Sequence, residues 1–345
     1  MWLLTNETPF AAERTWVRDE NGAEVWLVAV KGSFLIQEDG RSLLNPLQTE
    51  VSRVPKFRGD PATTSLLFES DLIHKKICTD VIVHGHAYAP GERPYATVDV
   101  RLKIANIDKT LRIYGDRVVE GGFLGVSASD AQPFTKMPIT YERSFGGTDQ
   151  QEEDPKNHDW EPRNPVGVGF GRRAEHVLGK AAPNVEHPNS PYTSHKRGTP
   201  AAFGPIARHW SPRVGYAGTY DDRWEEERMP LLPLDFDDKF YQCAPEDQQT
   251  EGFLKGGEIV ELFNMTPGGY LIFDLPRVWF ALSTQLGSER IEHRANLHTV
   301  IIEPDVPQVV LVWHSALPCH GKETKLYRTI VRQKEYVRLG QVRHA

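Results

Sequence analysis

Apolar and polar residues alternate most regularly between residues 97 and 114. From Val98 to Ile104 the even-numbered positions are apolar and the odd-numbered positions are polar, so a strand would place them on opposite faces. After a polar link at residues 106–108 the alternation resumes. Two alternating segments joined by a short link predict a β-hairpin with one buried face.

Other segments carry weaker strand patterns. Residues 24–36 are rich in β-branched and aromatic side chains and continue past Gly32, which predicts a buried strand that bends there. Residues 258–264 and 270–275 flank a Thr-Pro-Gly-Gly turn and predict a second hairpin. Further strands are predicted at residues 76–88, 139–145, 278–283, 297–303 and 309–314. The basic tail, residues 322–345, fits neither the helical nor the strand period.

The middle of the chain has little periodicity. Residues 178–233 are rich in proline, glycine, histidine and aromatic residues, which is typical of long ordered loops over a core. One short helix is predicted within residues 220–229, where Asp221 or Asp222 can cap its start and Pro230 ends it.

These elements predict a mainly β protein with one or two antiparallel, sandwich-like units, long ordered loops and few short helices. We place an N-terminal β-rich domain with a loop-rich extension at residues 1–240. Residues 241–345 form a C-terminal β-rich part, which is either a second unit or continuous with the first.

Residues 137–170 hold the densest turn signals. Gly146-Gly147 follows the predicted strand at 139–145 and predicts a turn with positive φ. The acidic insert that follows has Trp160 as its single large apolar residue, which predicts an exposed loop held by one aromatic ring.

Composition limits the classes of partner. The 345 residues carry a formal net charge of −7, which argues against a general nucleic-acid binder, and the basic run His195-Lys196-Arg197 is too short to reverse this. We expect no membrane insertion, because no apolar run approaches the roughly 20 residues of a spanning helix. The three cysteines have no CxxC spacing, so a reducing cytoplasm is the expected compartment.

The best metal candidate is His84-Gly85-His86. A strand would place both imidazoles on one face, with Asp80 as a possible third ligand. No second motif matches it, so we predict that the protein binds no metal, and the sequence indicates no cofactor.

Catalytic signatures are absent from the sequence, which has no GxSxG, HExxH or GxxxxGK[ST] motif. The carboxylate runs at residues 221–227 and 235–238 fit solvated caps, although a hydrolase acting on glycan or peptide would need such groups across a cleft. Aromatic residues between Trp160 and Trp224 fit anchors for irregular backbone, and the alternative is a lectin-like sugar-binding face.

Five segments in order resemble a known bacterial family. They read MPITYERSFGG, NPVGVGF, FGPIARHWSPRVGYAGTYDDRW, ERMPLLPLDFDDKFYQCAPEDQQ and GGEIVELFNMTPGGYLIFDLP. The chain resembles domain-of-unknown-function family 2169, whose members are associated with type VI secretion. The resemblance implies an adaptor or chaperone that loads a toxic effector onto the spike with its PAAR-containing tip. It brings no catalytic residues.

We therefore expect a cytoplasmic effector adaptor that is not an enzyme, with a secreted effector and a PAAR-containing or spike protein as partners. Its protein-binding residues are expected among large aromatic and arginine side chains, which commonly dominate protein interfaces. The candidates are Tyr141, Arg143, Trp160, Trp210 and Trp224. A hydrolase and a lectin-like module remain the alternatives.

Overall fold

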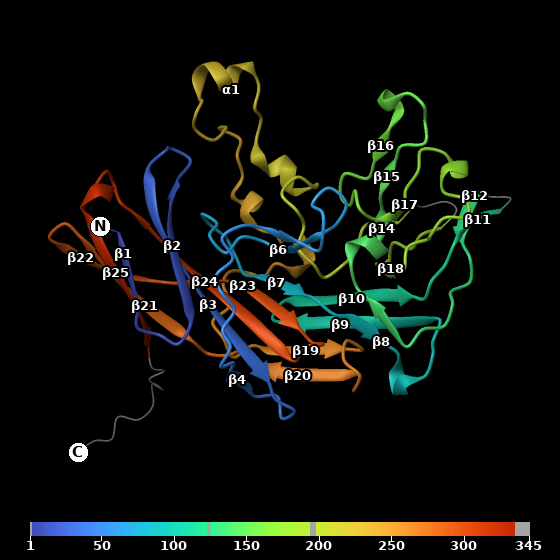
Figure 1. The fold of residues 1–345 in the computed structure, drawn as a ribbon, viewed down its shortest axis with the longest axis horizontal. Helices are drawn as coiled ribbons and strands as arrows, with labels where there is room; N and C mark the ends of the chain where they lie inside the picture. Colours follow the sequence, from blue (N-terminus) through green and yellow to red (C-terminus); the bar gives the residue numbers. More distant parts are fainter. Residues whose placement is uncertain (1, 123–124, 194–197, 335–345) are drawn as a thin grey trace.

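The computed structural model describes residues 2–122, 125–193 and 198–334. It confirms a mainly β protein with mostly antiparallel sheets. Figure 1 shows most strands of these sheets in the lower part of the view, with irregular segments gathered above β7, β9 and β10. No helix in the described part of the chain is long and apolar enough to cross a membrane.

A six-stranded sheet holds the longest strands. Its order is β2-β3-β24-β23-β7, and β4 pairs with the end of β3. The bounds are β2 Ala11–Arg18, β3 Glu24–Ile36, β4 Ser42–Leu44, β7 Asp80–Val83, β23 Asn296–Glu303 and β24 Gln308–Pro318. Residues 24–36 form β3 as predicted, and its near-continuous burial explains the apolar run.

A five-stranded sheet contains both predicted hairpins. Its order is β18-β10-β9-β19-β20. The bounds are β9 Thr97–Ile104, β10 Ile107–Tyr114, β18 Val185–Glu186, β19 Ile259–Phe263 and β20 Tyr270–Asp274. Strand β9 buries Val98, Val100, Leu102 and Ile104, so the predicted alternation is confirmed.

A four-stranded sheet joins the two ends of the described chain, with the order β1-β25-β21-β22. The bounds are β1 Leu3–Asn6, β21 Trp279–Leu286, β22 Glu289–Arg294 and β25 Leu326–Lys334. Residues 326–334 of the ambiguous tail therefore form a strand, and residues 335–345 lie outside the described residues. Strands from both sides of residue 240 are neighbours in all three sheets.

Short two-stranded pairs complete the β structure. They are β5 Lys56–Phe57 with β6 Leu66–Phe68, β8 His86–Tyr88 with β13 Lys136–Pro138, β11 Val119–Gly122 with β12 Gly125–Ala128, β14 Phe145–Gly146 with β17 Val168–Gly169, and β15 Thr148–Asp149 with β16 Asp159–Trp160.

One large apolar cluster connects the three main sheets. Phe10, beside β2, packs edge-on against Phe280 of β21, with ring centroids 5.4 Å apart. Phe280 in turn packs against Trp313 of β24 at 5.1 Å between centroids. These rings join the six-stranded and four-stranded sheets in one core.

Two strand predictions were wrong. Residues 139–145 form a 3-10 turn at Tyr141–Arg143 followed by β14, because Arg143 N–H and Ser144 N–H donate back to the Thr140 and Tyr141 carbonyls. The predicted strand 76–88 is divided into β7 and β8 around Gly85. A Cβ on Gly85 would lie 2.8 Å from Pro304, so this close approach requires glycine.

The helix prediction is confirmed. Helix α1 covers Asp222–Glu227, and Asp221 caps it by accepting a 2.9 Å hydrogen bond from Trp224 N–H. It is the one α-helix among the described residues, and it stands at the top of Figure 1.

Candidate functional site

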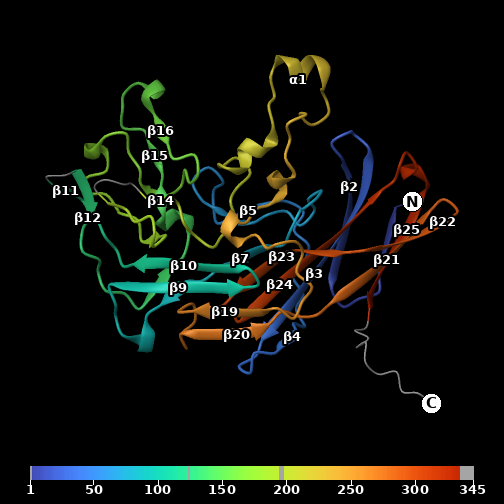
Figure 2. The same ribbon diagram turned by 180° about the vertical axis from the view of Figure 1, so that it is seen from behind.

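The segment between β13 and β19, residues 139–258, has little regular structure and is called the irregular layer here. Apart from the undescribed residues 194–197, it consists of very short strands, 3-10 turns, loops and α1. Strand β18 of this segment belongs to the five-stranded sheet, and Figures 1 and 2 show most of the rest on one side of the main sheets from both directions. It has few backbone ladders, so side chains that hydrogen-bond the backbone add to single backbone contacts, such as the one from Val83 N–H to the Phe203 carbonyl at 3.1 Å.

Asn164 fixes one part of the irregular layer. Its side chain is fully buried, and Nδ2 donates to the carbonyls of Tyr141 and Phe145 at 2.8 and 2.9 Å. Gly146 and Gly147 have φ of 149° and 114°, which confirms the predicted positive-φ turn. A Cβ on Gly146 would overlap the Asn164 carbonyl oxygen, so two loops distant in sequence meet through glycine.

Gln248 fixes a second part of the layer to the sheets. Its Nε2 donates to the Val81 carbonyl of β7 at 2.7 Å and to the Phe203 carbonyl at 3.0 Å. Its Oε1 accepts from Lys109 of β10 at 2.7 Å. One buried amide therefore joins the six-stranded sheet, the five-stranded sheet and the layer.

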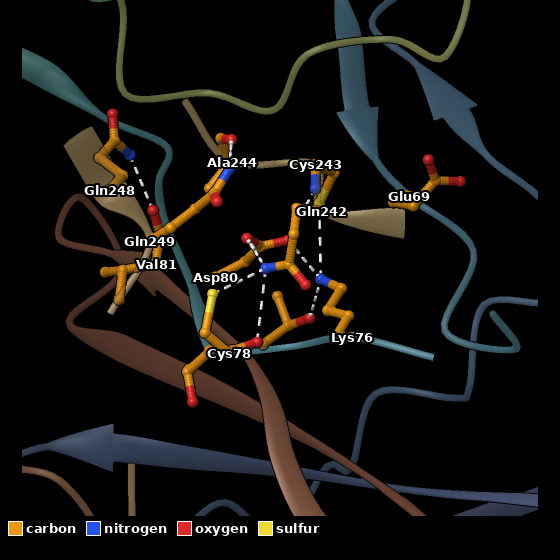
Figure 3. Close-up of polar contacts among 12 residues, drawn as sticks. Glu69, Lys76, Cys78, Asp80, Val81, Gln242, Cys243, Ala244, Gln248 and Gln249 are labelled. Carbon is orange, nitrogen blue, oxygen red and sulfur yellow. Dashed lines mark hydrogen bonds and ion pairs between the residues drawn. The ribbon is translucent and has the colours of Figure 1, made fainter. Parts of the chain in front are cut away.

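A buried ion pair lies beside this attachment (Figure 3). Lys76 Nζ contacts Asp80 Oδ2 at 2.5 Å, and both side chains are almost completely buried. Asp80 also accepts from Gln242 Nε2 and from Cys243 N–H, at 2.8 and 2.7 Å. Burial lowers the pKa of Lys76, but the Asp80 carboxylate outweighs burial, so the pKa lies above its ordinary value.

Cys243 lies 3.7 Å from the same ammonium, sulfur to nitrogen. Burial raises the pKa of its thiol to about 12, although Lys76 acts in the opposite direction. The thiol is therefore protonated at neutral pH and is poorly suited to act as a nucleophile, because the thiolate is the reactive form.

Glu69 forms the centre of another buried group. Its carboxylate accepts from Arg213 Nη1 at 2.8 Å and from Arg208 Nη2 at 3.0 Å. Burial raises the pKa of Glu69, but the two guanidinium groups outweigh it, so the pKa lies below its ordinary value. Glu69 is thus ionised and bound by both arginines. It connects the irregular layer to the segment before β7.

The predicted protein-binding residues do not form one patch. Tyr141 and Trp210 are buried and pack edge-on at 5.5 Å between ring centroids, so neither residue presents an exposed ring face on the molecular surface. Arg143 is partly exposed and binds Asp116 Oδ1 at 2.9 Å. Of these three candidates, Arg143 is therefore the one with an exposed side chain.

The remaining two tryptophans lie at separate ends of the layer. Trp160 in β16 has 54% of its surface exposed. Trp224 in α1 is half-buried, and its indole N–H donates to the Leu231 carbonyl at 2.8 Å. Figure 1 shows β16 and α1 projecting as two separate features.

The histidine candidates have different surroundings. His84 is buried, and its Nδ1 lies 3.4 Å from Arg58 Nη2. His86 is partly exposed, and its Nδ1 lies 2.7 Å from Asp305 Oδ2. Asp80 is paired with Lys76, so the three predicted ligands do not converge, and no group of three or more potential ligands occurs among the described residues. That the protein binds no metal remains a prediction.

The carboxylate run at residues 235–238 lines an open pocket of about 530 Å³, which includes Glu20, Asp235, Asp237 and Asp238. Asp235 accepts from Thr219 N–H at 2.9 Å, and Asp237 accepts from Lys239 N–H at 2.9 Å. Asp238 is paired with Lys75. Three of these carboxylates therefore have local contacts that cap turns or neutralise charge.

Sequence reasoning missed the buried polar residues Asn164, Lys109 and Gln248. Lys109 had a usable signal, because it occupies an inward position of β10 between Ile107 and Leu111. Asn164 and Gln248 lie in irregular segments, where no periodicity separates buried from exposed positions. The basic run His195-Lys196-Arg197 lies outside the described residues.

One family model matches the chain. It is described as "Uncharacterized protein conserved in bacteria (DUF2169)" and matches residues 21–314. No curated protein and no solved structure matches the chain at a significant level. The matched residues include all of the irregular layer and most strands of the three main sheets.

Proposed function

The chain belongs to the bacterial family DUF2169, and from this premise we propose that it is a cytoplasmic adaptor for a type VI secretion effector. It binds the effector before secretion and helps load it onto the PAAR-containing spike. The resemblance of the ordered motifs to effector adaptors motivates the proposal. Binding of this kind needs a shaped surface and no catalytic group.

The observation that carries the proposal is the α1 projection, residues 218–236, which stands out from the body of the molecule in Figures 1 and 2. It exposes Tyr220, Met229 and Leu234, with 53%, 59% and 81% of their surfaces accessible. Large apolar side chains gathered on one projecting segment favour a protein contact.

Contacts within the projection and with the rest of the molecule hold it in place. Trp224 packs against Tyr220 at 4.7 Å between ring centroids and holds the Leu231 carbonyl. Arg228 donates to the Glu20 carbonyl in the turn between β2 and β3 at 2.5 Å. Because these contacts fix the projection before binding, less conformational entropy is lost when a partner docks.

The test is copurification of the tagged protein with the product of the effector gene beside its own gene. The double variant Met229→Glu/Leu234→Glu places two charges on the projection and should weaken the complex at least about 30-fold, as expected for loss of a hot spot. Leu47→Glu is the matched control, because Leu47 is 82% exposed but lies outside the projection. Equal binding by both variants would show that the projection is not part of the interface.

The second candidate is a hydrolase, which the carboxylate-lined pocket near Asp235 favours. The local hydrogen bonds of these carboxylates favour the adaptor instead. Turnover of a cell-wall glycan or peptide that disappears in a folded Asp235→Asn variant would support the hydrolase.

A further inference from the structure

A smaller pocket of about 250 Å³ opens within the irregular layer beside β10. Its apolar wall includes Pro200, Ile206 and Pro212, and its polar side includes Tyr141 and Asp247. Pockets for drug-sized ligands usually measure about 300–1,000 Å³. This one is smaller and suits a single chemical group, such as one side chain of a larger partner.

Tyr141 supplies an unused donor to this pocket. The residue is only 4% exposed, and its ring is fixed against Trp210. Its hydroxyl has no hydrogen-bond partner among the described residues. Buried tyrosine hydroxyls usually have a partner, so a ligand that brings an acceptor would complete the site.

Asp247 supplies an acceptor on the same pocket. Its Oδ1 accepts from Lys109 Nζ at 2.9 Å, and Oδ2 has no hydrogen-bond partner within the described chain. Lys109 also donates to the Ala202 carbonyl and to Gln248 Oε1, at 2.9 and 2.7 Å. All three ammonium protons are therefore used, and Lys109 orients Asp247 without offering a donor to a ligand.

Charge in the pocket favours a neutral ligand. A carboxylate would be repelled by Asp247, whose field acts on the Tyr141 hydroxyl: burial, and then Asp247, raise the pKa of that tyrosine. The cations that line the pocket are already paired, Lys109 with Asp247 and Arg163 with Glu161, so an ionic ligand would meet no uncompensated charge there. A neutral group with one acceptor and one donor complements the Tyr141 hydroxyl, which is a donor, and Asp247 Oδ2, which is an acceptor on a half-exposed side chain.

We propose that this pocket binds an amide group of the effector, whose carbonyl accepts from the Tyr141 hydroxyl and whose N–H donates to Asp247 Oδ2. An asparagine or glutamine side chain and a peptide bond share this chemistry. The inference rests on the proposed adaptor function, since it assigns the chemistry that one site on the partner must present.

The test uses three capped peptides, acetyl-Gly-Gln-Gly-amide and its glutamate and alanine equivalents, titrated into the full chain with ¹³C-labelled tyrosine. We expect the glutamine peptide to bind at millimolar concentration and more tightly than the glutamate peptide. Tyr141→Phe should weaken this binding about three- to tenfold, the effect of one neutral hydrogen bond. Tyr95→Phe is the control, because Tyr95 lies before β9 at the end of the hairpin opposite Lys109.

Asp247→Asn gives a second test that does not depend on Tyr141. If the oxygen of the new side-chain amide stays on Lys109, the acceptor facing the ligand becomes an N–H donor, so the preference should reverse from glutamine to glutamate. Equal binding of the glutamine and alanine peptides would assign the peptide bond as the amide. Tighter binding of glutamate to the unmodified protein, no binding of any peptide, or no effect of Tyr141→Phe would overturn the proposal.

Different results would overturn the adaptor proposal and the amide-pocket proposal. Copurification of an effector together with absent peptide binding would overturn the amide pocket and leave the adaptor function standing. Peptide binding without any effector complex would support the pocket and contradict the adaptor function.

Discussion

At the scale of single residues, the interior holds several buried charges. Lys31, Lys76 and Lys109 are all buried, and each contacts an aspartate. Lysine is rarely buried unless it is paired. Lys31 lies within residues 24–36, which predicted a buried strand, whereas local pattern does not distinguish Lys76 from a surface lysine. For both residues, only the folded structure shows which carboxylate they meet.

Breaking the Lys76–Asp80 pair should strongly lower the free energy of unfolding. Asp80→Asn keeps the shape but leaves the buried ammonium uncompensated, so we expect a loss of about 3–5 kcal/mol in the free energy of unfolding. The double variant Lys76→Met/Asp80→Asn should lose less, because no unpaired charge remains. Urea unfolding measures both values.

The control for this comparison is Glu227→Gln, which breaks the exposed pair with Arg223. Exposed pairs contribute little, so its effect should stay below about 1 kcal/mol. Equal stability of Asp80→Asn and Glu227→Gln would contradict the structural role given to Asp80.

Buried His314 should make stability depend on pH. Burial, with a smaller effect of Lys76, lowers its pKa to about 3. Since the unfolded chain binds a proton near pH 6.5 and the folded chain does not, folding should weaken as pH falls from about 6.5 towards 3. This histidine alone should remove about 2 kcal/mol between pH 7 and pH 5.

His314→Leu cannot titrate and should reduce that loss by the same amount. Urea unfolding at both pH values checks this, with the difference between pH values as the readout, so a constant packing effect cancels. His298, whose ring centroid is 4.2 Å from that of His314, also has a lowered pKa and should preserve part of the slope. An identical slope in the variant and the unmodified protein would refute the assignment.

At the scale of elements, local patterns predicted the hairpin strands β9 and β10 well. In each strand, the alternation of apolar and polar residues indicates which face is buried. The segment 139–145 shows the limit of that approach. Its alternation resembles a strand, but its carbonyls bind the amide of Asn164, which is about twenty residues away. A tertiary contact therefore overrides the local pattern.

The Gly146-Gly147 turn is the element most sensitive to substitution. Gly146→Val should lower the free energy of unfolding by about 3 kcal/mol or more, because positive φ and a clash with the Asn164 backbone act together. Gly147→Val should also destabilise, since its Cβ would lie 2.6 Å from the Gly167 carbonyl oxygen.

Gly268→Ala is the matched control for the turn, because nothing lies within 4 Å of the added Cβ and its φ is not positive. Thermal unfolding should separate the turn variants from this control by several degrees. Unchanged melting of both turn variants would show that the turn tolerates side chains.

At the scale of the whole molecule, the sequence predicted the β class but could not predict how the sheets are assembled. Leu35 of β3 pairs with Gln308 of β24, and β1 pairs with β25 at the far end of the described chain. Such long-range pairs leave no local pattern. The course of the irregular layer was equally inaccessible, because it depends on single contacts such as Gln248 with Val81.

The candidate binding residues illustrate the same limit. The sequence marked Trp210 and Trp224 alike as large aromatic residues, yet Trp210 is buried and Trp224 supports an exposed projection. Aromatic identity indicates that a ring will be anchored, and only the fold decides whether it faces a core or a partner.

The adaptor proposal is tested most directly by deleting this gene in its native bacterium and measuring delivery of the neighbouring effector into recipient cells. We expect that this effector's soluble level and its delivery fall, that delivery of unrelated effectors is unchanged, and that the unmodified gene restores delivery whereas the Met229→Glu/Leu234→Glu variant does not. Normal level and delivery of the neighbouring effector in the deletion strain would contradict the adaptor function.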